Sequence, residues 1–316
     1  MDSDVKGEEM LPQLSRRDFL AKTILSSAGI TALSCLSGNT HAVSPIQRKF
    51  GSRMKLSCTA YSYRKYLQEE SPPSMTMEDF LDECARMGLG AAEPTSYYFP
   101  DPLTEKYLLR YKRKAFLLGL DLSDLGIRNT FTYPPGPERE KNLQHVKQWV
   151  DYAAILGIPS LRIFAGDAPK GVSQNQAIQW CIETTEEACR YSGKQGIFLA
   201  MENHWGIVPD AESLLRIVHG VKSDWFGVSL DTGNFSTKDP YAEMAKVAPY
   251  AVNVQIKVEV STPGGGKTKA DFSRIIGLLG EAGYRGYVAL DYESTREPKE
   301  DIPRHIERLQ KILSCT

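Results

Sequence analysis

Short apolar runs alternate along the chain with longer amphipathic segments from about residue 50 onward. The apolar runs predict eight β-strands, at Lys55–Tyr61, Gly90–Glu93, Leu120–Ile127, Ser160–Ala165, Gly196–Glu202, Trp225–Asp231, Val252–Val258 and Gly286–Glu293. The segments between them predict helices near residues 76–88, 101–118, 137–157, 174–195, 210–220, 240–248, 271–282 and 301–313. In the first helix Phe80, Leu81 and Cys84 share one face, as expected of a helix that packs against a sheet.

This alternation of strands and helices indicates parallel strand pairing, because parallel strands need a crossover connection between them. Eight units without a break predict an α/β fold, a single-domain (β/α)8 TIM barrel over residues 54–316. A doubly wound open sheet is the structural alternative. It would be expected to carry a glycine-rich phosphate turn after an early strand, whereas the first strand here leads into Tyr61-Ser62-Tyr63-Arg64.

The beginning of the chain is typical of a twin-arginine export signal. Arg16 and Arg17 precede an apolar run from about residue 23 to 36, and small residues up to Ala42 suit an A-x-A type of cleavage site. The apolar run is too short for a permanent membrane span. We expect a signal peptide over residues 1–42, a linker over 43–53 and a periplasmic or otherwise exported protein. An amphipathic first helix with a chance arginine pair is the alternative.

The composition is that of an ordinary globular protein, with 41% hydrophobic and 24% charged residues and a net charge of −1. No basic stripe runs along the sequence, so nucleic-acid binding is disfavoured, because neutralising phosphates requires a local surplus of Lys and Arg. The glycine-rich stretch Pro263–Lys267 lacks the spacing of a phosphate-binding loop and predicts a flexible loop between a strand and a helix.

Polar side chains gather where the predicted strands end, which is where a TIM barrel forms its active site. Four successive strands end in an oxygen donor: Glu202, Asp231, Gln255 and Asp291. Side chains alternate along a strand, so Lys257 shares a face with Gln255, and Glu293 with Asp291. Inward-facing polar groups are costly when unpaired, so they must satisfy one another, bind water or hold an ion. Carboxylate and amide oxygens suit hard cations such as Mg2+ or Mn2+.

The same strand ends resemble those of the xylose-isomerase-like barrel superfamily, the sugar phosphate isomerase/epimerase group. The likeness is carried by residues 199–204 (LAMENH), 228–235 (VSLDTGNF), 252–257 (VNVQIK) and 283–291 (GYRGYVALD). In that family one metal is held by a Glu, an Asp, a His and a Glu on strands five to eight. The resemblance places these metal ligands on Glu202, Asp231, Gln255 and Asp291.

The sequence departs from the family's pattern at three positions. Gln255 stands where the family has a His, and Asn234 stands where a second His often follows the strand-six Asp. Asp291 is one methylene shorter than the family's Glu, so Glu293 could be the working carboxylate instead. A glutamine binds a transition metal more weakly than an imidazole does. We therefore expect Mn2+ or Mg2+ rather than Zn2+, or no metal.

The resemblance implies an isomerase or epimerase that moves a proton next to the carbonyl of a sugar with the help of a metal, or a keto-sugar lyase that begins with the same step. The proton-transferring carboxylates would be Glu202 and Asp291, or Glu293. Lys257 could stabilise the developing oxyanion, or merely form an ion pair with Glu259 or Glu293.

Further side chains near the strand ends are candidates for binding the sugar: His204, Arg162, Trp205 and Asn234. Arg162 could instead orient Glu93 or Glu202. Two other functions stay open. One is a non-catalytic carbohydrate-binding barrel with a degenerate metal site. The other is a nuclease resembling apurinic endonucleases, which needs a His-rich cluster of zinc ligands, whereas the whole sequence has five His.

Overall fold

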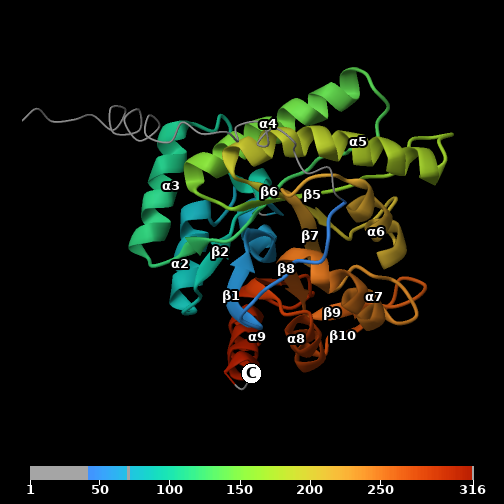
Figure 1. The fold of residues 1–316 in the computed structure, drawn as a ribbon. Coiled ribbons are helices and arrows are strands. Elements are labelled where there is room, and N and C mark those ends of the chain that lie inside the picture. The colour runs from blue at the N-terminus through green and yellow to red at the C-terminus, as the bar shows by residue number, and fades with distance from the viewer. Residues whose placement is uncertain (1–41, 70–71, 315–316) are drawn as a thin grey trace, which may run out of the picture. The chain divides into compact units, whose positions relative to one another are not determined.

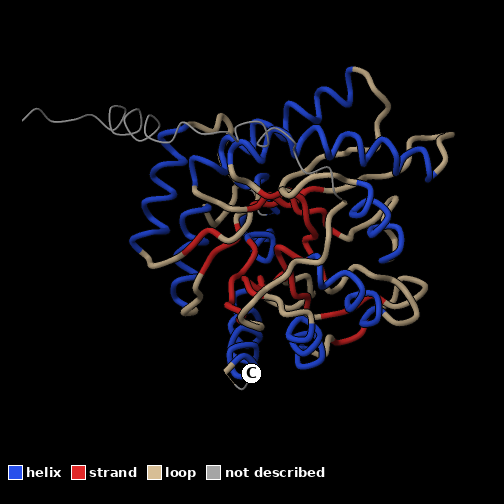
Figure 2. The backbone as a smooth tube through the Cα atoms, viewed as in Figure 1, coloured by secondary structure: helices blue, strands red, loops and turns tan. Residues whose placement is uncertain are grey.

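The computed structural model describes residues 42–69 and 72–314. The expected signal peptide therefore lies outside the described residues, apart from Ala42. Within the described chain the strands form a central ring, and the helices lie outside it (Figures 1 and 2). None of the helices described is long and apolar enough to cross a membrane.

The barrel sheet is built from nine strand segments: β1 (Arg53–Thr59), β2 (Ala91–Glu93), β3 (Asp121–Leu122), β4 (Leu125–Gly126), β5 (Ser160–Ile163), β6 (Phe198–Glu202), β7 (Phe226–Asp231), β8 (Ala251–Lys257) and β11 (Arg285–Asp291). Their order in the sheet is β3-β2-β1-β11-β8-β7-β6-β5-β4, and every neighbouring pair is parallel. The two segments at the ends of this order, β3 and β4, are consecutive pieces of one strand position.

The ring closes because both pieces of the third strand bond to the second. The backbone N–H of Ser123 donates to the carbonyl of Ala92 at 3.0 Å, and that of Gly126 donates to the carbonyl of Pro94 at 3.1 Å. The predicted (β/α)8 barrel is confirmed, and the open-sheet alternative is wrong. The prediction of one continuous third strand is also wrong, because the chain turns the carboxylate of Asp124 into the barrel, where it accepts a hydrogen bond from Ser160.

Eight α-helices follow the strands, within a few residues of the predicted positions: α2 (Met77–Arg86), α3 (Glu105–Leu117), α4 (Pro137–Leu156), α5 (Gln174–Ser192), α6 (Ala211–Gly220), α7 (Pro240–Val247), α8 (Phe272–Glu281) and α9 (Pro298–Leu313). Thr76 caps α2 through a reciprocal pair of hydrogen bonds with Asp79. Gly157 ends α4 in a left-handed conformation (φ 78°) that other residues rarely adopt. Phe80, Leu81 and Cys84 of α2 are fully buried, as the pattern predicts.

Two further features lie at the ends of the barrel. Before β1, the N–H of Ile46 donates to the carbonyl of Pro249 at 2.9 Å, so part of the expected linker is tied to the barrel. After β8, the antiparallel hairpin of β9 (Glu259–Ser261) and β10 (Lys267–Lys269) leads to α8. The predicted flexible loop is therefore the turn of a hairpin, in which the N–H of Thr262 donates to the carbonyl of Gly266 at 2.8 Å.

Candidate active site

A cavity of about 630 Å³ opens at the carboxyl ends of the barrel strands. Nine of the ten residues singled out from the sequence line it: Arg162, Glu202, His204, Trp205, Asn234, Gln255, Lys257, Asp291 and Glu293. The tenth, Asp231, is fully buried beside them at the end of β7. The fold thus brings together residues from five strands (β5, β6, β7, β8 and β11) and the segments that follow them, at the place where TIM barrels hold their active sites.

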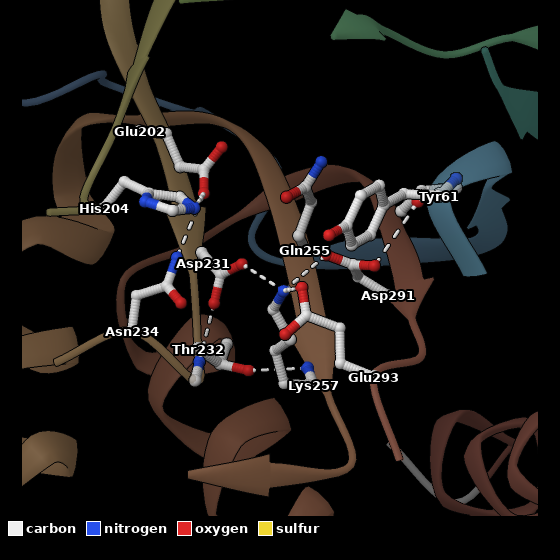
Figure 3. A network of polar contacts seen from close by, with 12 residues as sticks. Tyr61, Glu202, His204, Asp231, Thr232, Asn234, Gln255, Lys257, Asp291 and Glu293 are labelled. Atoms are coloured by element: carbon white, nitrogen blue, oxygen red, sulfur yellow. Dashed lines mark hydrogen bonds and ion pairs between the residues drawn. The ribbon is translucent and has the colours of Figure 1, made fainter. Parts of the chain in front are cut away.

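The ammonium group of Lys257, at the end of β8, lies among three carboxylates (Figure 3). Its Nζ donates to Asp291 Oδ2 and to Glu293 Oε1, both at 2.6 Å, and lies 3.2 Å from Asp231 Oδ2. Of the two ion-pair partners suggested by the sequence, Glu293 is present, whereas Glu259 belongs to the next strand, β9. Lys257 is only 6% exposed, so solvent and salt screen these ion pairs weakly.

The position of Lys257 is built by the turn that follows β7. The backbone N–H of Lys257 donates to Thr232 Oγ1 at 2.9 Å, and the N–H of Thr232 donates to the carbonyl of Gln255 at 3.0 Å. The side-chain stem passes directly over Gly233, where an added Cβ would lie 2.6 Å from Lys257 Cγ. Glycine at this position therefore makes the room through which the lysine reaches the carboxylates.

Glu202, at the end of β6, is held by side chains from both sides. Its Oε2 lies 3.0 Å from Arg162 Nε, and its Oε1 accepts a hydrogen bond from Asn234 Nδ2 at 3.0 Å. Arg162 also donates to the carbonyl of Ile127 at 2.7 Å and to the hydroxyl of Tyr97 at 3.0 Å. Arg162 and Asn234 therefore orient Glu202 and leave its carboxylate at the cavity wall.

Asparagine side chains extend the strand pairing at two of the strand ends. Asn203 exchanges hydrogen bonds of 2.8 Å with the backbone N–H and carbonyl of Asp231, and Asn129 does the same with Phe164. Each amide thus imitates a neighbouring backbone where the regular ladder has ended. The carboxylates of Glu202 and Asp231 are fixed relative to each other in this way.

Gln255, which the resemblance places at the family's histidine position, is bonded to the barrel interior. Its Nε2 donates to Glu93 Oε1 at 2.5 Å, and Asn253 Nδ2 donates to the other oxygen of the same carboxylate at 3.1 Å. In Figure 3 the amide nitrogen of Gln255 points away from the Lys257 ammonium. Glu93 is fully buried, so this hydrogen bond fixes the orientation of the glutamine.

The protonation states of Lys257 and Glu293 are set by their burial and by the charges next to them. Burial opposes the charge on Lys257, but the three carboxylates outweigh it and raise the pKa of Lys257 well above its usual value. Burial likewise opposes the charge on Glu293, but the attraction of Lys257 and its hydrogen bond lower the pKa of this carboxyl. Lys257 and Glu293 therefore form a charged pair at neutral pH.

Two carboxyl groups deeper in the site are held closer to neutrality. Burial raises the pKa of Glu202 to about 8 despite the attraction of Arg162, and it raises the pKa of Asp231 to about 7 despite that of Lys257. Burial and the neighbouring cations lower the pKa of His204 to about 2, so its imidazole is neutral. Glu202 is thus poised to exchange a proton near neutral pH.

Aromatic side chains form one wall of the cavity. Trp205 is 49% exposed, and its ring lies 5.0 Å from that of Phe164 and 3.6 Å from that of His204, measured between centroids. His204 Nε2 lies 3.7 Å from Glu202 Oε1, beyond hydrogen-bond distance. Exposed aromatic faces beside polar groups suit the apolar face of a sugar ring.

Sequence reasoning missed several residues that line the cavity, among them Tyr97 and Asn142. Tyr97, which contacts Arg162, lies in a short 3-10 helix after β2 (Ser96–Tyr98), where no strand or helix periodicity marks it. Asn142 reaches the cavity from α4 and accepts the N–H of Thr130 at 2.9 Å. For Tyr97, the signal in the sequence is the aromatic run Tyr97-Tyr98-Phe99 after the second predicted strand.

The residues as arranged do not fit the divalent metal that the family resemblance implies. Two of the four predicted ligands, Asp231 and Asp291, face the ammonium of Lys257. Across residues 42–69 and 72–314, no group of three or more His, Cys, Asp and Glu side chains is arranged to hold a metal ion. This donor set suits an ammonium group.

The sequence profile of a family described as xylose isomerase-like TIM barrel matches residues 81–312. The barrel fold agrees with that match, and the chain belongs to the xylose isomerase-like TIM barrel family. Its curated relatives include L-ribulose-5-phosphate 3-epimerase UlaE of Escherichia coli (strain K12), which is 22% identical over 185 residues. The matched part covers 54% of this chain and 65% of that relative.

Solved structures with sugar substrates or metals share the fold. D-psicose 3-epimerase with D-tagatose from Clostridium cellulolyticum H10 superposes with a TM-score of 0.68 at 15% identity, over 82% of this chain and 99% of that one. The IolI protein with a bound zinc atom gives a TM-score of 0.65 at 16% identity, over 82% and 96% of the two chains. At these identities the likeness concerns the fold alone.

Proposed function

We propose that this protein is a sugar isomerase or epimerase that moves a proton on the carbon next to a carbonyl group. The observation that carries the proposal is the pair of carboxylate positions around one cavity. Glu202 comes from β6, and Asp291 and Glu293 come from β11 and the residues after it, with the Lys257 ammonium between them (Figure 3). Epimerases of sugars among the relatives and similar structures support this reaction class.

Glu202 is the candidate general base in this proposal. Its pKa lies near neutrality, where a base can both take and return a proton efficiently. Arg162 and Asn234 are positioning residues, because each holds one carboxylate oxygen and neither needs to contact the reacting carbon. Asp291, or Glu293, would exchange the proton from the other side of the sugar.

Lys257 is the candidate group for stabilising the negative oxygen that develops when the proton leaves. An ammonium has three N–H donors: two bond to Asp291 and Glu293, and the third faces Asp231 Oδ2 at 3.2 Å, so a sugar oxygen would bind Lys257 in place of one of these carboxylates. A fixed positive charge in a site shielded from water stabilises an enolate oxygen without reorganising at the moment of reaction. Trp205 and His204 would contact the sugar beside this oxygen.

The proposal is tested by solvent exchange. The purified protein is incubated in deuterium oxide with a panel of ketoses and aldoses, with and without a phosphate group, and each sugar is followed by NMR. We expect deuterium at a single carbon next to the carbonyl for at least one sugar. The Glu202→Gln variant should lose this exchange, whereas the matched variant Glu78→Gln, in the ion pair with Arg110 between α2 and α3, should keep it. A panel without any exchange would contradict the proposal.

A second candidate function is a non-catalytic sugar-binding barrel. It is favoured by the fixed orientation of Gln255, whose amide nitrogen donates to Glu93, because a side chain held in this way can bind a sugar hydroxyl without taking part in proton transfer. Such a protein would bind a sugar in calorimetry yet leave its protons unexchanged. A keto-sugar lyase would exchange the proton and then release a leaving group, which appears as a new product in the same NMR spectra.

We also propose that the protein is exported by the twin-arginine route, on the strength of Arg16 and Arg17 before an apolar run. Expression of the full chain should yield a periplasmic protein whose first residue is Val43. Replacing both arginines by lysine should leave the protein in the cytoplasm with its leader attached. A mature protein that retains residues 1–42 outside the cytoplasm would contradict the expected cleavage.

A further inference from the structure

The centre of the carboxylate cluster is occupied by a side chain of the protein itself. Lys257 Nζ lies 2.6 Å from Asp291 Oδ2 and 3.2 Å from Asp231 Oδ2, and these are two of the oxygens assigned to a metal by the family resemblance. Its third partner, Glu293 Oε1, lies at 2.6 Å. A divalent cation bound by the same oxygens would lie directly against this ammonium, and two like charges at such a distance repel strongly.

Of the remaining predicted ligands, Glu202 is held by Arg162 and Asn234. Gln255 is oriented by its amide nitrogen, which donates to the buried carboxylate of Glu93, and this bond leaves its amide oxygen unused. Among the fully buried oxygens of the predicted ligands, Asp231 Oδ2 has no hydrogen bond, and it faces the ammonium. The positive charge that this oxygen requires is supplied by Lys257 alone among the contacts described.

The lysine is held in this place by the fold. Its backbone is bonded to Thr232, its stem fills the space above Gly233, and it is almost fully buried. A long side chain fixed along its whole length cannot move aside without leaving three carboxylates uncompensated. The ammonium is therefore a permanent part of the site.

We infer that the ammonium of Lys257 replaces the divalent metal of this fold's sugar sites, so that the protein holds its carboxylates and acts on its sugar without a bound metal. The substrate class in this inference, a sugar, rests on the proposed function. The position of the Lys257 ammonium among the three carboxylates is given by the distances alone and does not depend on the substrate. A lysine supplies one positive charge and N–H donors, and, unlike a bound metal ion, it cannot be removed by a chelator.

The test is a measurement of metal binding by the full, folded protein. Wild-type protein from medium supplemented with Mn2+ is analysed for metal content, dialysed against EDTA, and titrated with Mn2+ by electron paramagnetic resonance. We expect far less than one ion per chain and no rise of the melting temperature with Mn2+. About one tightly bound ion per chain, with a lower melting temperature after chelation, would overturn the inference.

The Lys257→Met variant keeps the length of the stem and removes its charge. We expect it to bind Mn2+ at least about tenfold more tightly than the wild type, because its carboxylates then lack a cation. Lys246→Met, which removes the cation of an exposed pair with Glu243 on α7, is the matched control and should bind no better than the wild type. A folded Lys257→Met protein without such a gain would overturn the inference; if this variant does not fold, Lys257→Gln is titrated in the same way.

Failure of the inference and failure of the proposed function give different results. The Mn2+ titration needs no substrate, so it decides the role of Lys257 even if no sugar is found. If the titration agrees with the inference but no sugar exchanges deuterium, the proposed function is the part that fails. If exchange occurs and is abolished by EDTA and restored by Mn2+, the reaction class stands and the inference fails.

Discussion

The placement of Lys257 depends directly on Gly233, so Gly233→Ala should disturb it. An added Cβ would lie 2.6 Å from Lys257 Cγ, 2.8 Å from Lys257 Cβ and 2.9 Å from the backbone oxygen of Glu259. Carbon atoms normally approach to about 3.5–4.0 Å. These atoms lie on or near the backbone of the neighbouring strands, so none can swing away as the tip of a flexible side chain would.

The expected cost follows from this crowding. Inserting a methyl group into a well-packed interior typically costs about 1–3 kcal/mol, because neighbours must leave their preferred positions. The added methyl group would displace the stem of Lys257 by force, and its Nζ would then move relative to Asp231 and Asp291. Since misplacing a group of an active site by about 1 Å can slow a reaction about 100-fold, the rate of deuterium exchange should also fall, by up to about 100-fold.

Urea unfolding and the rate of deuterium exchange measure the two effects separately. The matched control is Gly277→Ala on α8, where an added Cβ meets no heavy atom within 4 Å. Alanine in a helix should leave that variant as stable as the wild type or more stable by about 0.5–1 kcal/mol, with unchanged exchange. A Gly233→Ala protein that matches this control in both stability and exchange would refute the role given to Gly233 and to the position of Lys257.

Three further predictions concern the same cavity. Arg162→Met should destabilise the protein by about 3–5 kcal/mol in urea unfolding, because it leaves the buried carboxylate of Glu202 without its cation. Lys114→Met, in the partly exposed pair with Asp82, should cost no more than about 1 kcal/mol. Equal losses of stability would count against the pairing of Arg162 with Glu202. The exchange rate should rise with pH up to about 8 and then level off, because burial raises the pKa of the base Glu202 to about 8 and only the ionised form accepts a proton; a rate that is constant between pH 6 and 8 would exclude Glu202 as the base. Trp205→Ala should raise KM for the sugar more than it lowers kcat, as steady-state kinetics would reveal, and an unchanged KM would exclude stacking on this ring.

The barrel itself could be predicted because its signals are local. Each strand is a short apolar run, each helix has an apolar stripe, and caps such as Thr76 and Gly157 follow from single residues and their neighbours. The break in the third strand was missed because its cause is not local. Asp124 turns inward to meet Ser160, a residue 36 positions away that nothing in the third strand announces.

The sequence predicted which residues form the site, but not which of their side chains bond to one another. Strand ends of a barrel converge, so Glu202, Lys257 and Asp291 were expected in one place. Which oxygen meets which nitrogen depends on side-chain directions across the barrel, such as the bond from Gln255 to Glu93 over 162 positions of sequence. The central place of the Lys257 ammonium among the carboxylates is a consequence of those directions.

The most direct test of the central claim is deuterium exchange by chelator-treated protein with the sugar that the panel identifies. The claim is that Glu202 takes the proton while the Lys257 ammonium stabilises the oxygen. We expect deuterium exchange at a single carbon, at an undiminished rate after EDTA treatment. The Glu202→Gln and Lys257→Met variants should lose this exchange. Exchange by a Glu202→Gln protein at the wild-type rate would contradict the account.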